Sequence, residues 1–118
     1  MNSLDDYNVS IEEIHHIHKL DAPSGTAITL AKEILANLDR KTKWELNSES
    51  DSHTIKINAI REDEVPGTHI ITYNSDVDYI EIKHLAKSRK GFAMGAVIAA
   101  EYIRDKKGIY TMDKLLNL

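Results

Sequence analysis

The stretch "EEIHHIHKLDAPSGTA", Glu12–Ala27, joins a predicted strand to a predicted helix. Apolar residues lie among polar ones over 7–16, which indicates a strand. Pro23 favours an extended residue before it, and Ser24 is a residue type that caps helices. This stretch therefore predicts a strand that ends near the histidines and a helix that begins after Ser24.

The chain beyond this point shows further regular patterns. Apolar residues fall on one helical stripe over 25–38, so we expect a helix there. Strand-like runs follow over 53–62, 68–75 and 78–86, and turn residues separate them. The polar segment 39–52 is expected to be an exposed loop.

Two more helices are expected near the end of the chain. Ser88 is a candidate cap for a helix that runs to about Asp105, and Thr111 for a short one over 112–116. A strand–helix–strand connection favours parallel pairing and hairpins favour antiparallel pairing. We therefore predict an α+β domain with a mixed four-stranded sheet and helices mainly on one face.

The last two predicted strands carry apolar residues on both faces. By alternation we expect one face to take Ile71, Tyr73, Val77 and Tyr79, and the other to take Ile70 and Ile80 or Ile82. Twist at the sheet edge with partial exposure of these residues is one explanation for strands that are apolar on both faces. We favour a second subunit on the open face, so that this face serves oligomerisation.

The bulk composition bounds the class of protein. A length of 118 residues predicts one domain, 1–118, and the absence of cysteine excludes disulfides and a Cys nucleophile. A net charge of -4 argues against nucleic-acid or anionic-membrane binding. No apolar run reaches the roughly 20 residues of a membrane span, and the N-terminus does not resemble a signal peptide. We expect a cytoplasmic location.

The histidine cluster first suggests a metal. On a regular strand His16 and His18 point away from His15, so the three cannot converge on one ion, and we expect no metal. His18, His53 and His69 are interpreted as structural, surface or hydrogen-bonded residues.

The predicted helix start has the features of an anion site. The first N–H groups of a helix lack internal partners, and the dipole makes that end electropositive. Gly25 opens the backbone, Thr26 adds a hydroxyl and Lys19 adds a charge, so these residues are expected to hold a carboxylate. His15 or His16 would then move a proton. A capped helix without a ligand is the alternative.

Several motifs together resemble those of the dihydrodipicolinate reductase family of bacterial lysine and diaminopimelate biosynthesis. They are "EEIHHIHKLDAPSGTA", "VPGTH" at 65–69, "IKHLAKSRKGFAMGA" at 82–96 and "GIYTMDKLL" at 108–116. The similarity covers essentially the whole chain. It implies an oxidoreductase that reduces a small cyclic dicarboxylate with NADPH or NADH.

The resemblance also implies residue roles. His15 matches the family's proton donor or acceptor, and Lys19 matches its proton donor, which faces the substrate. Positions His16, Gly25 and Thr26 match substrate-binding positions of the family.

The family has an N-terminal Rossmann nucleotide domain, and none of the five glycines here forms a nucleotide-binding motif. We therefore expect a fragment, the substrate-binding and tetramerisation domain, that binds no cofactor by itself. Residues 88–118 are expected to dock toward the missing domain, and the parent to be a homotetramer assembled through its sheets. The alternative is a free-standing dicarboxylate-binding or oligomerisation module without turnover.

Overall fold

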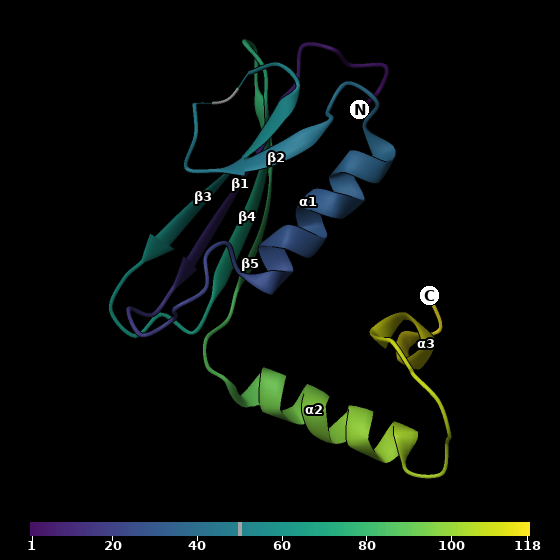
Figure 1. The fold of residues 1–118 in the computed structure, drawn as a ribbon. Coiled ribbons are helices and arrows are strands. Elements are labelled where there is room, and N and C mark those ends of the chain that lie inside the picture. The colour runs from purple at the N-terminus through teal and green to yellow at the C-terminus, as the bar shows by residue number, and fades with distance from the viewer. Residues whose placement is uncertain (50) are drawn as a thin grey trace. The chain divides into compact units, whose positions relative to one another are not determined.

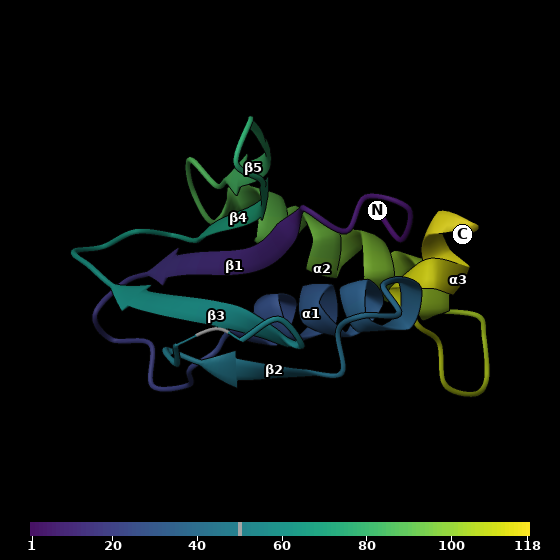
Figure 2. The ribbon, with the colours of Figure 1, turned by 90° about the horizontal axis from the view of Figure 1, so that it is seen from above.

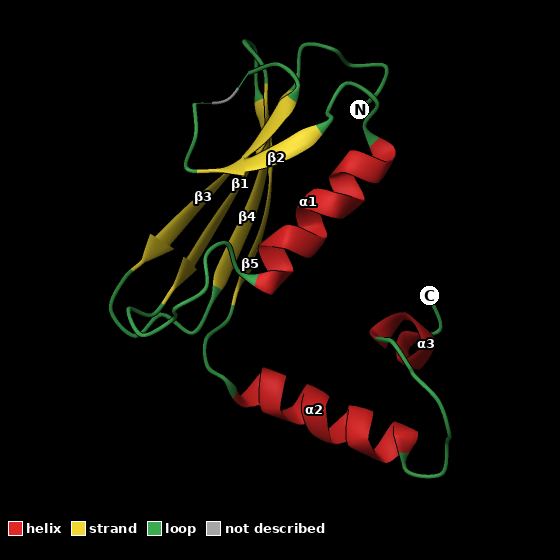
Figure 3. Ribbon diagram, viewed as in Figure 1, coloured by secondary structure: helices red, strands yellow, loops and turns green. Residues whose placement is uncertain are grey.

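The computed structural model describes residues 1–49 and 51–118, which form two compact units, Met1–Leu85 and Ala86–Leu118 (Figure 1). All strands of the described chain lie in the first unit, and the second consists of helices and loops (Figure 3). In chain order the elements are β1 (Asn8–His15), α1 (Gly25–Asn37), β2 (Lys43–Leu46), β3 (Thr54–Arg61), β4 (Thr68–Asn74), β5 (Tyr79–Leu85), α2 (Lys90–Ile103) and α3 (Met112–Leu116).

The sheet of the first unit is mixed and has the strand order β2-β3-β1-β4-β5 (Figure 2). Strand β1 is central: it pairs in parallel with β3 and antiparallel with β4. Strand β2 extends the parallel half, and β5 extends the antiparallel half. The predicted α+β class with a mixed sheet is therefore confirmed.

Helix α1 begins where the sequence predicts. Ser24 has extended backbone, and its hydroxyl accepts the N–H of Ala27 at 3.2 Å, so it is the N-cap. The helix ends at Asn37, one residue before the predicted end. It lies along one face of the sheet (Figure 1).

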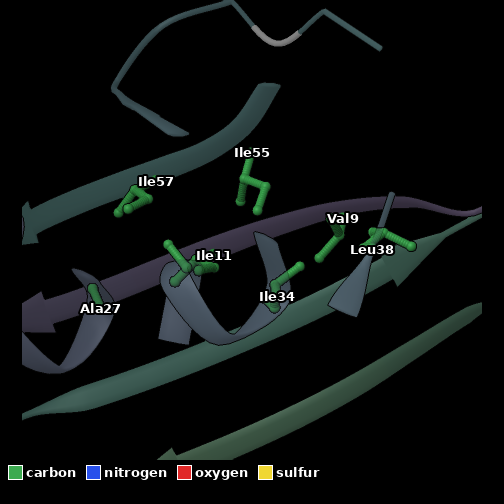
Figure 4. Close-up of a cluster of buried hydrophobic side chains, with 8 residues drawn as sticks. Val9, Ile11, Ala27, Ile34, Leu38, Ile55 and Ile57 are labelled. Carbon is green, nitrogen blue, oxygen red and sulfur yellow. The ribbon is translucent and has the colours of Figure 1, made fainter. Parts of the chain in front are cut away.

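The apolar stripe of α1 forms the core with two neighbouring strands. In Figure 4 the side chains of β1 and β3 lie against those of the helix. The buried residues are Val9, Ile11, Ala27, Ala31, Ile34, Leu38, Ile55 and Ile57. This core fixes α1 over the centre of the sheet.

The predicted number of strands was wrong. The segment 39–52 contains a short strand, β2, which pairs in parallel with β3. Trp44 is half-buried against the core and pairs with Ile55. Its two neighbours in β2, Lys43 and Glu45, form an ion pair with 2.6 Å between Nζ and Oε1. One alternating pair of apolar residues in four was too short a signal among so many polar ones.

The strands on either side of the "DEVPG" turn are not neighbours. Strand β1 lies between β3 and β4, so the turn crosses the end of β1. The N–H of Glu62 donates to the carbonyl of His15 at 2.9 Å, and the N–H of Ile17 donates to Asp63 at 3.1 Å. The turn thus covers the end of the strand that carries the histidines.

The predicted division of faces was also wrong for β5. Ile71 pairs with Ile82 and Tyr73 pairs with Ile80, and directly paired residues share a face. Val77 is not on a strand but in the turn, where it is 88% exposed. Asn74 pairs with Tyr79 across this turn, so odd-numbered residues of β4 share a face with even-numbered residues of β5, and simple alternation through 74–79 gives the wrong phase.

The second unit holds α2 and α3. Helix α2 begins at Lys90, not after Ser88, whose hydroxyl accepts the N–H of Lys90 at 3.3 Å. Thr111 occupies the N-cap position of α3 without a side-chain cap bond. Exposed apolar side chains follow one another along α2: Phe92, Met94, Val97, Ile98 and Ile103.

The unit is held by contacts between α2 and the chain that follows it. The hydroxyl of Tyr102 donates to the carbonyl of Lys114 at 3.2 Å, and the ammonium of Lys106 lies 3.8 Å from the centre of the Tyr102 ring.

In the described part of the chain, no helix has the length and hydrophobicity needed to span a bilayer.

The core assignment predicts the effect of a truncation. Ile57→Ala should lower the free energy of unfolding by about 2–5 kcal/mol, because it removes buried methyl groups and leaves a cavity under α1. Ile17→Ala is the matched control, since Ile17 is 59% exposed, and should change it by less than about 0.5 kcal/mol. Urea unfolding followed by circular dichroism measures both, and equal losses would contradict this core.

Candidate functional site

Polar and titratable side chains gather where β1 ends. Glu13 lies opposite His69 of β4, and His15 lies opposite Arg61 of β3. Paired residues share a face, so these four side chains lie on the face that α1 covers. The same face is therefore an apolar core along most of α1 and a polar cluster beside its first residue.

Glu13 is the centre of this cluster, and it is 0% exposed. Arg61 donates to both of its carboxylate oxygens, at 3.1 Å to Oε2 and 2.9 Å to Oε1. The backbone N–H of Ser24 donates to Oε1 at 3.1 Å, and Nδ1 of His15 is hydrogen-bonded to Oε2. One carboxylate thus joins β1 to β3 and to the start of α1.

The contacts of Glu13 keep it ionised. Burial by itself raises the pKa of this carboxyl, but the hydrogen bonds from Arg61 and His15 outweigh burial and hold the pKa below its ordinary value. Glu13 is therefore a buried anion at neutral pH. A bidentate guanidinium is the partner that best satisfies such a group.

His69 lies beside His15 in the cluster. The two rings meet edge to face with 5.2 Å between their centres, and Nε2 of His69 lies 3.0 Å from the hydroxyl of Ser24. Burial, and then the nearby His15, lower the pKa of His69, so its imidazole is neutral at neutral pH. The structural interpretation of His69 as a hydrogen-bonded residue is consistent with these contacts, but the residue also packs on a candidate site residue.

The backbone of Gly67 lies close to the ring of His15. A Cβ built on Gly67 would lie 3.1 Å from Nε2 of His15, and its φ of +153° is a conformation that L side chains rarely adopt. Glycine at this turn position therefore keeps the second ring nitrogen of His15 clear of a side chain.

The loop 16–24 carries Lys19 to the same end of the sheet. The ammonium of Lys19 donates to Asp21 at 2.8 Å, and this hydrogen bond lowers the pKa of Asp21. Arg61 donates to the backbone carbonyl of Asp21 at 2.6 Å. The guanidinium that binds Glu13 thus also fixes the loop that bears the lysine.

The two adjacent histidines have different surroundings. Strand β1 ends at His15, and the ring of the following His16 lies near that of His18, with 5.9 Å between the centres. His18 is exposed and lies 2.8 Å from Glu64. The structure thus brings His15 into the buried cluster and groups His16 with the surface histidine.

The start of α1 completes the site. The N–H of Ala27 donates to the hydroxyl of Ser24, and the N–H of Ile28 donates to the carbonyl of Ser24 at 3.0 Å. The N–H groups of Gly25 and Thr26 precede these and lie beyond the intrahelical ladder. Open space surrounds the position of a Cβ on Gly25, so this backbone is accessible.

Sequence reasoning did not place Glu13, Arg61 or His69 in the site, and it interpreted His69 as a structural residue. Glu13 has a sequence signal, since a charged residue alternates with Val9 and Ile11 on the buried face of a strand. Arg61 and His69 become part of the site only through the pairing of β1 with β3 and β4, whose register the sequence pattern does not define. Among the described residues, no group of three or more histidines and carboxylates has the arrangement of a metal site.

The fold and the cluster define a class of protein: an α+β domain whose polar site lies where a central strand ends and a capped helix begins. A family model described as "Dihydrodipicolinate reductase, C-terminus" matches residues 1–116. The chain belongs to this family and corresponds to its C-terminal domain.

Curated relatives agree with this family. A 4-hydroxy-tetrahydrodipicolinate reductase of Christiangramia forsetii is 58% identical over 99% of this chain and 48% of its own length. The enzyme of the same name from Methanocaldococcus jannaschii is 39% identical over 98% of this chain and 44% of its own length. The chain therefore spans about half the length of the curated relatives it matches.

A solved structure has the same fold. It is the dipicolinate-bound dihydrodipicolinate reductase of Paenisporosarcina sp. TG-14, with a TM-score of 0.62. The match covers 95% of this chain and 46% of that one at 22% sequence identity, so it supports the fold.

The buried carboxylate predicts how stability depends on pH. The folded-state pKa of Glu13 is lowered, so its contribution is present above the ordinary glutamate value of about 4.3 and is lost as pH falls through the folded value. Glu13→Gln should flatten the acid side of the stability profile. At pH 7 it should cost about 3–5 kcal/mol, because it leaves Arg61 with an uncompensated charge.

Glu12→Gln is the matched control for this prediction. Glu12 lies one residue away on the opposite face, where it accepts a 3.0 Å hydrogen bond from Asn58. Its loss should cost no more than about 1.5 kcal/mol. Urea titrations at several pH values measure both variants, and an unchanged acid slope in Glu13→Gln would contradict the assignment.

Proposed function

We propose that this chain is the substrate-binding half of an NAD(P)H-dependent 4-hydroxy-tetrahydrodipicolinate reductase, an enzyme of lysine and diaminopimelate biosynthesis. The observation that carries the proposal is that His15, in a cluster with a buried anion, lies beside an accessible helix start in a chain of this family. The names of the curated relatives support the same activity.

The proposed ligand is a small cyclic dicarboxylate. Gly25 and Thr26 offer N–H groups at the positive end of α1, and Lys19 offers an ammonium. Each charged hydrogen bond of this kind contributes about 1.5–3 kcal/mol. His16 adds a further donor from the end of β1. Binding would exchange the Lys19 contact with Asp21 for one with the ligand.

His15 is the proposed acid. Its imidazole would donate a proton to the negative charge that develops on the substrate, and Lys19 would stabilise that charge or donate in its place. A positioned acid of this kind contributes about 10²–10⁴-fold to the rate.

The nicotinamide cofactor does not fit the residues of this chain. The connection from β1 to α1 carries "DAPSGTA" and not a glycine-rich dinucleotide loop. We therefore assign NADPH or NADH binding to the part of the longer relatives that precedes this domain, and derive no step through it.

Two further assignments belong to the proposal. Residues 88–118 dock on that preceding domain, which the exposed apolar side chains of α2 support. The protein assembles as a homotetramer through its sheets, and the exposed apolar residues of β5 support self-association.

Ligand binding tests the site without the cofactor. Titration calorimetry with pyridine-2,6-dicarboxylate should show binding that Lys19→Ala reduces at least about tenfold, because a charged hydrogen bond is lost. Lys43→Ala is the matched control: Lys43 also pairs with a carboxylate two residues away, and its loss should have no effect. Equal affinity in the Lys19 variant would rule out this site.

Turnover tests the division between the two histidines. The chain is joined to the part of the Christiangramia forsetii relative that precedes the matching domain. Consumption of NADPH or NADH is then followed by absorbance. His15→Gln should lower kcat by about 10²–10⁴-fold with little change in KM, because an acid acts in the transition state. His16→Gln should mainly raise KM, because a binding contact also forms in the ground state.

His53→Gln is the control for this experiment, since His53 lies outside the site and contacts the carbonyl of Arg40. A His15→Gln variant that retains half of the parental kcat contradicts the catalytic assignment. Tight dicarboxylate binding with no turnover in the unaltered joined protein instead supports a binding module.

A further inference from the structure

The contacts of Glu13 decide which nitrogen of His15 carries the proton. Four donors converge on the two carboxylate oxygens: two N–H groups of Arg61, the N–H of Ser24 and Nδ1 of His15. An ionised carboxylate has no hydrogen to give and only accepts. The nitrogen at Nδ1 must therefore be an N–H whenever Glu13 is charged.

The other ring nitrogen, Nε2, points away from Glu13 and lies beside the backbone of Gly67. In the neutral imidazole one nitrogen is a donor and the other a lone-pair acceptor, so Nε2 bears the lone pair and gains a proton when the ring is charged. The glycine at position 67 leaves that side clear of a Cβ, which would come within 3.1 Å of Nε2. Nε2 is thus the atom through which His15 exchanges protons.

We propose that Glu13 is the positioning residue for His15, and that Arg61 and Ser24 hold its carboxylate in place for this task. Glu13 fixes the ring orientation and the Nδ1–H tautomer, so that Nε2 is the nitrogen on the side of Gly67 and is left to exchange the proton. The inference rests on the proposed function for its link to catalysis. The tautomer itself follows from the contacts within β1, β3 and the start of α1.

Glutamine at position 13 has a predictable effect on the ring. Its amide has one oxygen where the carboxylate has two, and Arg61 and the Ser24 N–H compete for that oxygen. The amide NH₂ then faces His15 and donates to Nδ1. The imidazole changes to the Nε2–H tautomer, and the charged ring that donates the proton then has no acceptor for its Nδ1–H.

The first experiment observes the tautomer directly. In the ¹⁵N-labelled 118-residue chain, long-range proton–nitrogen correlation spectra distinguish a ring N–H from a lone-pair nitrogen. The measurement is made at about pH 8.5, above the ordinary histidine pKa of about 6.5. The His15 signals are assigned by their absence in His15→Gln. We expect Nδ1–H in the unaltered chain and Nε2–H in Glu13→Gln, whereas Glu12→Gln should keep Nδ1–H.

The second experiment measures turnover in the protein joined to the preceding part of the Christiangramia forsetii relative. Glu13→Gln should lower kcat about 10–100-fold, the range found when a partner that orients a metal-bound histidine is lost. Its KM should stay within about twofold, because binding uses Lys19 and the helix start. Both roles predict a loss of stability in Glu13→Gln, but a merely structural glutamate would leave the tautomer in place and would not lower kcat at an unchanged KM.

The outcomes separate this inference from the proposed function. An Nε2–H tautomer in the unaltered chain overturns the inference, and this result does not require Glu13→Gln to fold. A Glu13→Gln variant that keeps its parental kcat also overturns it. Absence of reductase activity in the unaltered joined protein overturns the proposed function. The tautomer measurement does not depend on turnover, so it still tests the contact between Glu13 and His15.

Discussion

A carboxylate that is completely shielded from water is unfavourable in a protein unless donors surround it. Glu13 meets this condition on the central strand, where the guanidinium of Arg61, the Ser24 N–H and His15 all reach it. The carboxylate can be satisfied only if β3 and the start of α1 are both in place. The polar site and the fold of the first unit therefore depend on each other.

The position of β1 explains how these groups meet. The connection through α1 and β2 returns the chain to β3 on one side of β1, and the turn at 62–67 then crosses to β4 on the other side. The end of β1 is thus bounded by two neighbouring strands, a turn and a helix start. Residues far apart in the sequence, such as Glu13, Arg61 and His69, come together because of this crossing.

Local signals in the sequence predicted local structure well. Ser24 as a cap, the stripe of α1 and the end of β1 at the histidines all depend on residues within one or two turns of chain. Strand β2 was missed because four residues are too short for a clear alternation. The pairing around β1 and the phase of β5 depend on contacts between distant segments and on turn length, which hydrophobic periodicity does not encode.

A second buried charge, at the other end of β1, shows why burial alone does not identify a site. Lys41 donates to the side-chain oxygen of Asn8 at 2.6 Å and to the carbonyl of Thr54 at 3.1 Å, and burial lowers its pKa. Lys41 thus joins the first residues of β1 and β3 through two neutral oxygens, which is a structural role.

Glu13 differs from Lys41 because one of its donors is a titratable ring. The far nitrogen of that ring lies beside a glycine where a Cβ would come within 3.1 Å. Replacing a buried ionic group by apolar side chains often costs little stability. The arrangement around Glu13 is therefore better explained by the orientation it gives His15 than by the stability it adds.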